Sequence, residues 1–219
     1  MKKIDLNTVC LRVAVIVGAV AGGCASTGIY HNVPPAYNLP ANQDKKVLIW
    51  IETPRSAAAD PDASEKLAQA LRNHLVAKAN MKPENVLLAP QFGNVTADML
   101  ITPETAALQA GAGLALFVRI EEYELLPMNI RNFHSGRMLT RTILLDAQTA
   151  QPLWPSDTLG KQHDIVVELG KGDRNEMLSR LNNSTAHCIV RNLYPIKKIY
   201  YKNSDERISI QEAFELETF

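Results

Sequence analysis

Leu114-Ala-Leu-Phe-Val-Arg-Ile-Glu-Glu-Tyr-Glu-Leu125 is the stretch that decides the fold. Its first half is almost continuously apolar and its second half is acidic, which predicts a long strand that begins in the core and ends in solvent. The chain then returns as a second strand over residues 137–146. If the turn lies near Arg131, Arg141 falls opposite Glu121 in an antiparallel hairpin. An exposed ion pair there is worth only about 0.2–1 kcal/mol, so it sets the register more than the stability.

The segments on either side of this hairpin alternate between strand and helix patterns. The apolar run at residues 47–51 predicts a buried strand, and Asp62 with Glu65 has the spacing of a capping box at the start of a helix that ends near Ala79. The same rules predict two more helices. A short one begins at Thr102-Pro103 and stops at Gly111 and Gly113, and the last one is capped by Asp173 and Glu176 and ends at Tyr194-Pro195. They also predict three short strands, at 86–88, at Leu153-Trp154-Pro155 after a turn at 146–149, and at 165–169.

These elements predict an α/β (α+β) fold, in which about three helices pack on a mixed sheet in the order β-α-β-α-β-β-(β)-α. We expect four regions along the chain. They are a signal peptide at 1–23, a flexible Pro-containing tether at 24–45, a single α/β domain at 46–195 and a C-terminal tail at 196–219.

The first region ends in Val20-Ala21-Gly22-Gly23-Cys24, after two lysines and an apolar run over residues 13–20. This stretch resembles the bacterial lipobox, with Ala21 where Leu is usual, and the resemblance implies cleavage before Cys24 and lipid attachment to its sulfur. An uncleaved membrane anchor is the alternative, but the run is shorter than the roughly 20 residues that a spanning helix needs. Ala25 after the cysteine implies sorting to the outer membrane, facing the periplasm.

Charge and cysteine content narrow the classes of partner. Without residues 1–23, which hold three basic residues and one acid, the chain has 20 basic and 22 acidic side chains. This near balance excludes nucleic acid as a bulk partner. Cys188 is the one cysteine left after processing and lipidation, so we expect no intramolecular disulfide and a buried thiol on the last helix.

The sequence shows no pattern that would support catalysis. It contains no Gly-x-Ser-x-Gly, His-Glu-x-x-His or Cys-x-x-Cys motif, and its five histidines are scattered singly. Gly111-Ala-Gly113 precedes a strand instead of opening a helix, which disfavours a nucleotide site. We therefore expect no catalytic residue, no metal and no cofactor.

Two stretches together carry a family resemblance. Gly113-Leu-Ala-Leu-Phe-Val-Arg-Ile-Glu-Glu-Tyr-Glu and the later Asp146-Ala-Gln-Thr-Ala-Gln-Pro-Leu-Trp-Pro resemble the fold shared by the TolB amino-terminal domain, CsgG-type secretion lipoproteins and lipoprotein activators of penicillin-binding proteins. Ala150 stands where those domains usually have Gly, a residue that tolerates positive φ. The likeness spans about residues 46–195 and implies fold and compartment.

The functional expectation is a lipid-anchored envelope protein that acts as a non-enzymatic binding, scaffold or regulatory module for another envelope protein. Trp154, Tyr200 and Tyr201 are the candidate partner contacts, because aromatic side chains often anchor interfaces. The alternative is that the chain is a subunit of a secretion or export assembly and forms a homo-oligomer. A hydrolase of envelope polymers is a third reading.

Overall fold

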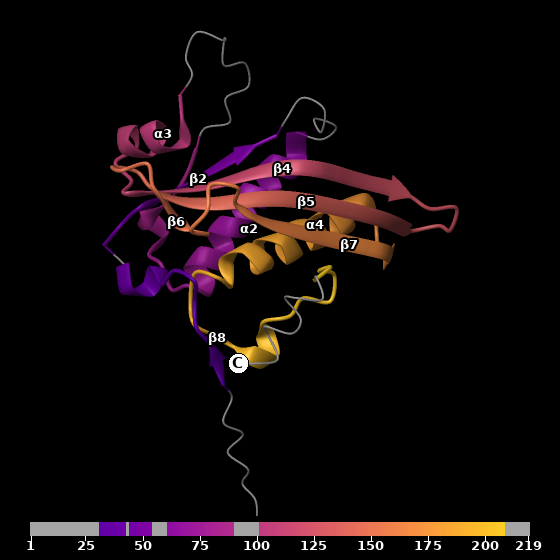
Figure 1. Ribbon diagram of the computed structural model, residues 1–219. Helices are drawn as coiled ribbons and strands as arrows, with labels where there is room; N and C mark the ends of the chain where they lie inside the picture. The colour runs from indigo at the N-terminus through magenta and orange to yellow at the C-terminus, as the bar shows by residue number, and fades with distance from the viewer. Residues whose placement is uncertain (1–30, 43, 54–60, 90–100, 209–219) are drawn as a thin grey trace, which may run out of the picture. The chain divides into compact units, whose positions relative to one another are not determined.

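A mixed six-stranded sheet forms the centre of the domain in the computed structural model, which describes residues 31–42, 44–53, 61–89 and 101–208 (Figure 1). The strand order is β3-β2-β4-β5-β6, and β7 also pairs with β5. β2 runs parallel to β3 and β4, whereas the pairs of β5 with β4, β6 and β7 are antiparallel. The strands are β2 (Val47–Glu52), β3 (Val86–Leu88), β4 (Leu114–Pro127), β5 (Phe133–Asp146), β6 (Pro152–Trp154) and β7 (Lys161–Lys171).

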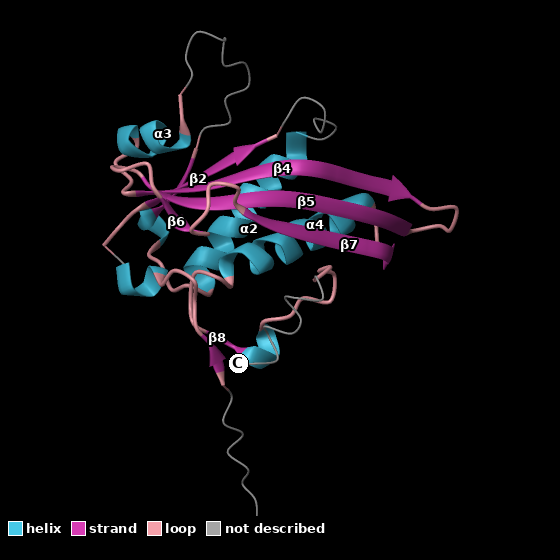
Figure 2. Cartoon of the chain, viewed as in Figure 1, coloured by secondary structure: helices cyan, strands magenta, loops and turns pink. Residues whose placement is uncertain are grey.

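Helices cover both faces of this sheet unequally. The long helices α2 (Pro61–Ala77) and α4 (Arg174–Val190) lie side by side on one face, and the short α3 (Pro103–Gln109) lies on the other (Figure 2). The predicted α/β class with three helices on a mixed sheet is therefore confirmed.

The main core lies between the sheet and the two long helices. Leu67, Leu71 and Leu75 recur at helical spacing on α2 and are fully buried in one core cluster with residues of β2, β3 and β4. Burying a leucine contributes about 1.5–3 kcal/mol, so this stripe fixes α2 on the sheet. Cys188 of α4 is also buried, as predicted, and burial raises the pKa of its thiol.

Helix boundaries match the sequence signals in part. Asp173 and Glu176 form the predicted capping box, with both backbone-to-carboxylate distances at 2.9 Å. The other predicted box is wrong, because α2 already begins at Pro61 and Asp62 lies in its first turn. The last helix also ends earlier than predicted, since the chain leaves α4 after Val190 through a tight turn.

The central hairpin contains a bulge that sequence reasoning did not place. Arg141 pairs by Cα with Arg119, and the register shifts between Ile120 and Glu122. The bulge brings Glu121 to the same face, where its Oε1 lies 2.6 Å from Arg141 Nε. The predicted ion pair therefore forms, but through the bulge instead of a direct cross-strand position.

The turn between β5 and β6 is built on Asp146. Its Oδ1 accepts hydrogen bonds from the backbone N–H groups of Gln148 and Thr149 at 3.0 and 3.1 Å. These bonds, led by that of Thr149, lower the pKa of Asp146. Ala150 closes the turn with φ at 56°, the left-handed conformation that the usual glycine would adopt without strain.

Part of the segment predicted as a tether belongs to the domain. β1 (Asn32–Val33) pairs with β8 (Ile196–Lys197), and the short helix η1 (Leu39–Asn42) follows. Leu39 is fully buried, and its N–H donates to Leu193 O at 3.0 Å. The predicted boundary at residue 46 thus leaves out residues that contact the turn after α4. The sequence did not indicate this contact, because Leu39 stands in a Pro-containing stretch that has no helical or strand periodicity.

Candidate functional site

The C-terminal segment after α4 folds back along this helix and onto the edge of β7. The helix η4 (Lys198–Tyr200) follows β8, and the chain then runs beside the sheet to residue 207. Val166 N donates to Asp205 O at 2.7 Å, and Arg207 N donates to Asp164 O at 2.9 Å. The segment is thereby held by backbone hydrogen bonds at the strand edge.

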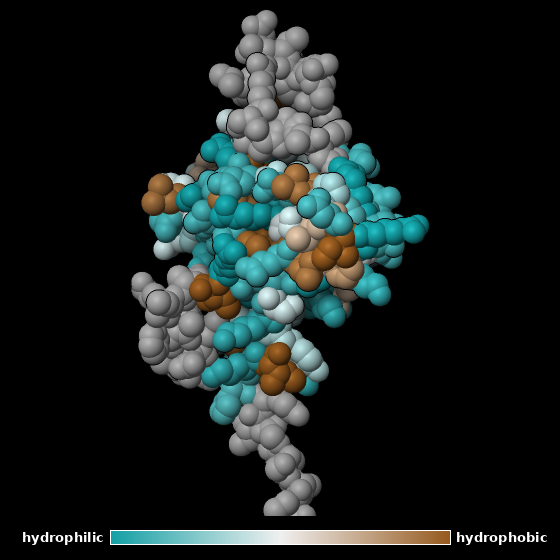
Figure 3. All heavy atoms as spheres, turned by 90° about the vertical axis from the view of Figure 1, so that its right-hand side faces the viewer, coloured by the Kyte–Doolittle hydropathy of each residue, from teal (hydrophilic) through white to brown (hydrophobic). Residues whose placement is uncertain are grey.

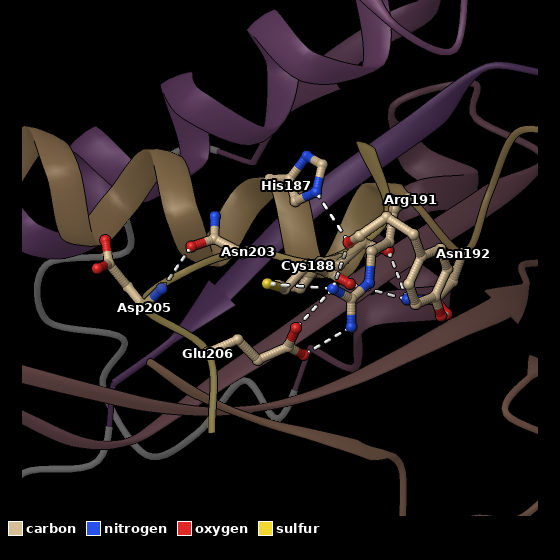
Figure 4. A network of polar contacts seen from close by, with 9 residues as sticks. His187, Cys188, Arg191, Asn192, Asn203, Asp205 and Glu206 are labelled. Carbon is tan, nitrogen blue, oxygen red and sulfur yellow. Dashed lines mark hydrogen bonds and ion pairs between the residues drawn. The ribbon is translucent and has the colours of Figure 1, made fainter. Parts of the chain in front are cut away.

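A buried ion pair fastens the same segment to α4 (Figure 4). The Arg191 side chain is 5% exposed, and its two terminal nitrogens lie 2.5 and 2.6 Å from the two carboxylate oxygens of Glu206. Arg191 Nη1 also donates to Tyr201 O at 2.8 Å, and the guanidinium lies 4.1 Å from the centre of the Tyr201 ring. Removing one partner of such a pair costs about 3–5 kcal/mol, because the other charge stays buried.

A second ion pair fixes the chain four to five residues after η4. Arg180 Nη2 and Nε lie 2.6 and 2.8 Å from the two carboxylate oxygens of Asp205. Ser184 Oγ donates to the same carboxylate at 3.2 Å. The Asp205 N–H donates to the side chain of Asn203 at 2.9 Å, as Figure 4 shows. The hydrogen bond to Asp205 raises the pKa of Arg180.

A pocket of about 620 Å³ opens between this fixed segment and the helices. Its walls come from the second half of α4, from Lys78 just after α2, from β8 and from the chain up to Asp205. Cavities of about 300–1,000 Å³ are typical of ligand sites. Ile199 and Tyr200 line its rim and are 58% and 61% exposed.

His74 of α2 lies beside His187 of α4, and His187 lines the pocket. The ring centroids of His74 and His187 are 6.2 Å apart in an edge contact. Burial, followed by the charges of His187 and Lys78, lowers the pKa of His74 to about 4. Burial is also the main cause that lowers the pKa of His187, whose Nε2 lies 3.2 Å from Tyr201 O. Both rings are therefore neutral at neutral pH.

The structure brings together two of the three predicted contact residues. Tyr200 is exposed beside the pocket, and Tyr201 is half-buried against Arg191 with its hydroxyl 3.3 Å from Asn192 Oδ1. Trp154 is 6% exposed and belongs to the core, so its proposed contact role is corrected. The residues next to Trp154 in the sequence did not indicate whether its side chain would be buried or exposed.

Other predicted features lie partly beyond the described residues. Cys24, the predicted lipid-attachment residue, lies outside them. Within residues 31–208 as described, no group of three or more His, Cys, Asp or Glu side chains is arranged to hold a metal ion. None of the described helices is long and apolar enough to span a membrane.

Neither the Arg191–Glu206 pair nor the meeting of Lys78 with Lys197 and Lys202 around one pocket was predicted from the sequence. Arg191 falls at the end of a helix and Glu206 in a polar tail, so the two residues look like ordinary surface charges. They meet only because the tail reverses direction at η4.

Comparisons with known proteins found similar solved structures from bacteria. No family model matches the chain, and no curated protein matches its sequence. The PelC dodecamer from Paraburkholderia phytofirmans is 15% identical, with a TM-score of 0.46 over 74% of this chain and 94% of that chain. Lipoprotein GNA1162 from Neisseria meningitidis is 16% identical, with a TM-score of 0.39 over 67% and 98%.

A putative lipoprotein from Caulobacter crescentus is also similar, at 17% identity and a TM-score of 0.35 over 64% of this chain and 83% of that chain. Bacterial lipoproteins are thus among the similar structures. At these identities and TM-scores the likeness assigns no role to this chain. The resemblance to TolB, CsgG-type proteins and penicillin-binding-protein activators stays a prediction.

Proposed function

We propose that this chain is a lipid-anchored protein of the bacterial envelope that faces the periplasm and binds another envelope protein, without catalysis of its own. Cys24 carries the lipid in this proposal, and Ala25 directs the protein to the outer membrane. The observation that supports binding best is the exposed pair Ile199 and Tyr200 at the rim of a formed pocket.

The rigidity of this surface favours a binding role. Tyrosine is enriched among the residues that dominate interface energetics. Tyr200 lies in a short helix between β8, which pairs with β1, and Tyr201, which is fixed by Arg191. A side chain on a fixed backbone loses less conformational entropy on binding than one on a free tail. Folding thus already orders the backbone of this apolar surface, so that binding a partner costs less conformational entropy.

The test is a crosslinking pull-down of the full-length lipidated protein from its own membranes. We expect one envelope protein to be captured, and we expect Cys24→Ser and Tyr200→Ala each to reduce its capture. Leu159→Ala is the matched control, because Leu159 is also exposed but lies outside the segment. Equal capture by Tyr200→Ala and the unchanged protein would refute the assigned surface.

A subunit of a secretion or export assembly is the second candidate, and the far end of the hairpin favours it. Leu126, Met128 and Ile130 are exposed there. Figure 3 looks onto this end and shows apolar side chains in separate groups among polar ones. Such broken apolar surface suits contact between copies of the chain. Light scattering of the lipidated protein in detergent separates the candidates, because only the assembly reading requires a defined oligomer that Ile130→Asp dissociates.

A further inference from the structure

Charge is unevenly distributed around the pocket beside η4. Lys78, Lys197 and Lys202 line it; the first follows α2, and the other two belong to the C-terminal segment after α4. Asp205 is the one acid among the described lining residues, and both of its oxygens are already held by Arg180. The walls therefore present more positive than negative charge to whatever enters.

The histidine environment is consistent with this excess. The charge of Lys78 and the neighbouring His187 both act to keep the His74 ring unprotonated, in addition to burial. His187 is itself kept neutral mainly by burial. These two imidazoles, of which His187 lines the pocket, contribute no charge at neutral pH, so the lysines dominate the potential.

Part of the lining is apolar. Tyr194, Pro195 and Ile196 form one side of the pocket, and Ile199 continues it toward the rim. Ile196 is itself buried and is held in β8 by pairing with Val33 of β1. A cationic side and an apolar side on fixed elements together suit a ligand with two corresponding parts.

We propose that this pocket binds an anionic group, such as a carboxylate or phosphate, that is joined to a compact apolar group. The apolar part packs against Tyr194, Pro195 and Ile196, and the anion lies toward Lys78 and Lys202. The ion pairs of Arg191 and Arg180 hold the walls in place before the ligand arrives, which lowers the cost of binding. This assignment concerns a ligand site and does not depend on capture of a protein partner.

The experiment is an NMR titration of the full chain, carrying Cys24→Ser, with three small probes of the same shape. These are 3-phenylpropionate, its neutral amide 3-phenylpropanamide and the cation 3-phenylpropylamine. We expect amide signals near His187 and Lys202 to shift, and the propionate to bind about fivefold or more tightly than the amide at low salt, with the amine weakest. Equal affinity for the propionate and the amide would overturn the proposal.

Charge variants test the position of the anion. Lys78→Gln with Lys202→Gln should reduce the preference for the propionate to about twofold or less. Lys82→Gln with Lys171→Gln removes the same net charge from lysines that do not line the pocket, and it should leave the preference intact. Thermal unfolding of both variants confirms that they fold. A preference lost equally in both variants would show a general charge effect and would also overturn the proposal.

The same variants distinguish the source of the anion. If the membrane pull-down loses its captured protein in Lys78→Gln with Lys202→Gln, the anion is an acidic group of that protein. If capture persists while the preference for the propionate is lost, the natural ligand is a free small molecule. If the unchanged protein captures no envelope protein, the proposed function is refuted, whereas the titration result is unaffected.

Discussion

His163 should make the domain sensitive to acid, and the size of the effect follows from its position. This side chain is buried in β7 opposite Thr140 of β5, and its ring lies 6.2 Å from that of Trp154. Neither ring nitrogen has a hydrogen-bond partner among the described residues. Burial, followed by the charges of Arg191 and Lys161, lowers the pKa of His163 to about 3.

The sign and magnitude of the effect follow from linkage. The unfolded chain takes up a proton on this histidine near its ordinary pKa of about 6.5, whereas the folded protein resists protonation until about pH 3. Stability is therefore fully present above pH 6.5 and is lost progressively as the pH falls toward 3. Between pH 8 and pH 5 the loss attributable to this group is about 2 kcal/mol.

Urea unfolding followed by tryptophan fluorescence measures this loss at both pH values. The comparison protein is His163→Leu, which removes the titrating ring but leaves His74 and the carboxylates in place. We expect the unchanged protein to lose about 2 kcal/mol more than the variant over this interval. The same pH dependence in both proteins would refute the reasoning, whatever their stabilities at pH 8.

Two further predictions concern the turn and the C-terminal segment. Ala150→Gly should raise the free energy of unfolding by about 0.5–1 kcal/mol, because relief of the left-handed strain exceeds the added entropy of the unfolded chain; Ala110→Gly, where φ is −79°, should lower it in the same urea assay. Glu206→Gln should lower it by about 3 kcal/mol or more, because Arg191 stays buried with its charge unpaired. Limited proteolysis should then cut the segment after Tyr201 faster, and unchanged cleavage would contradict its anchoring by Arg191.

Local signals predicted the fold well where one residue pattern fixes one element. The apolar run of β4, the capping box at Asp173 and the Thr102-Pro103 helix start each depend on neighbours within a few positions. The bulge at Glu121 and the added length of β7 depend on pairing between strands, which no local pattern records.

The candidate site was only partly predictable for the same reason. Tyr200 was a candidate because it is aromatic, but the pocket beside it is assembled from Lys78 after α2, from α4 and from the C-terminal segment. Trp154 had an equally suggestive sequence context and lies in the core. Distinguishing the two required the tertiary course of the chain after Val190.

The backbone bonds from the C-terminal segment to β7 have a consequence for solubility. Free strand edges can recruit strands from other molecules, and proteins commonly cover them to prevent aggregation. Here Asp205 and Arg207 occupy hydrogen-bonding positions on Val166 and Asp164, and a bridge joins Ile165 to Glu206. By holding the C-terminal segment in place, the Arg191–Glu206 pair thus keeps the edge of β7 covered. A chain without this pair would expose that edge, on which strands of other molecules could pair.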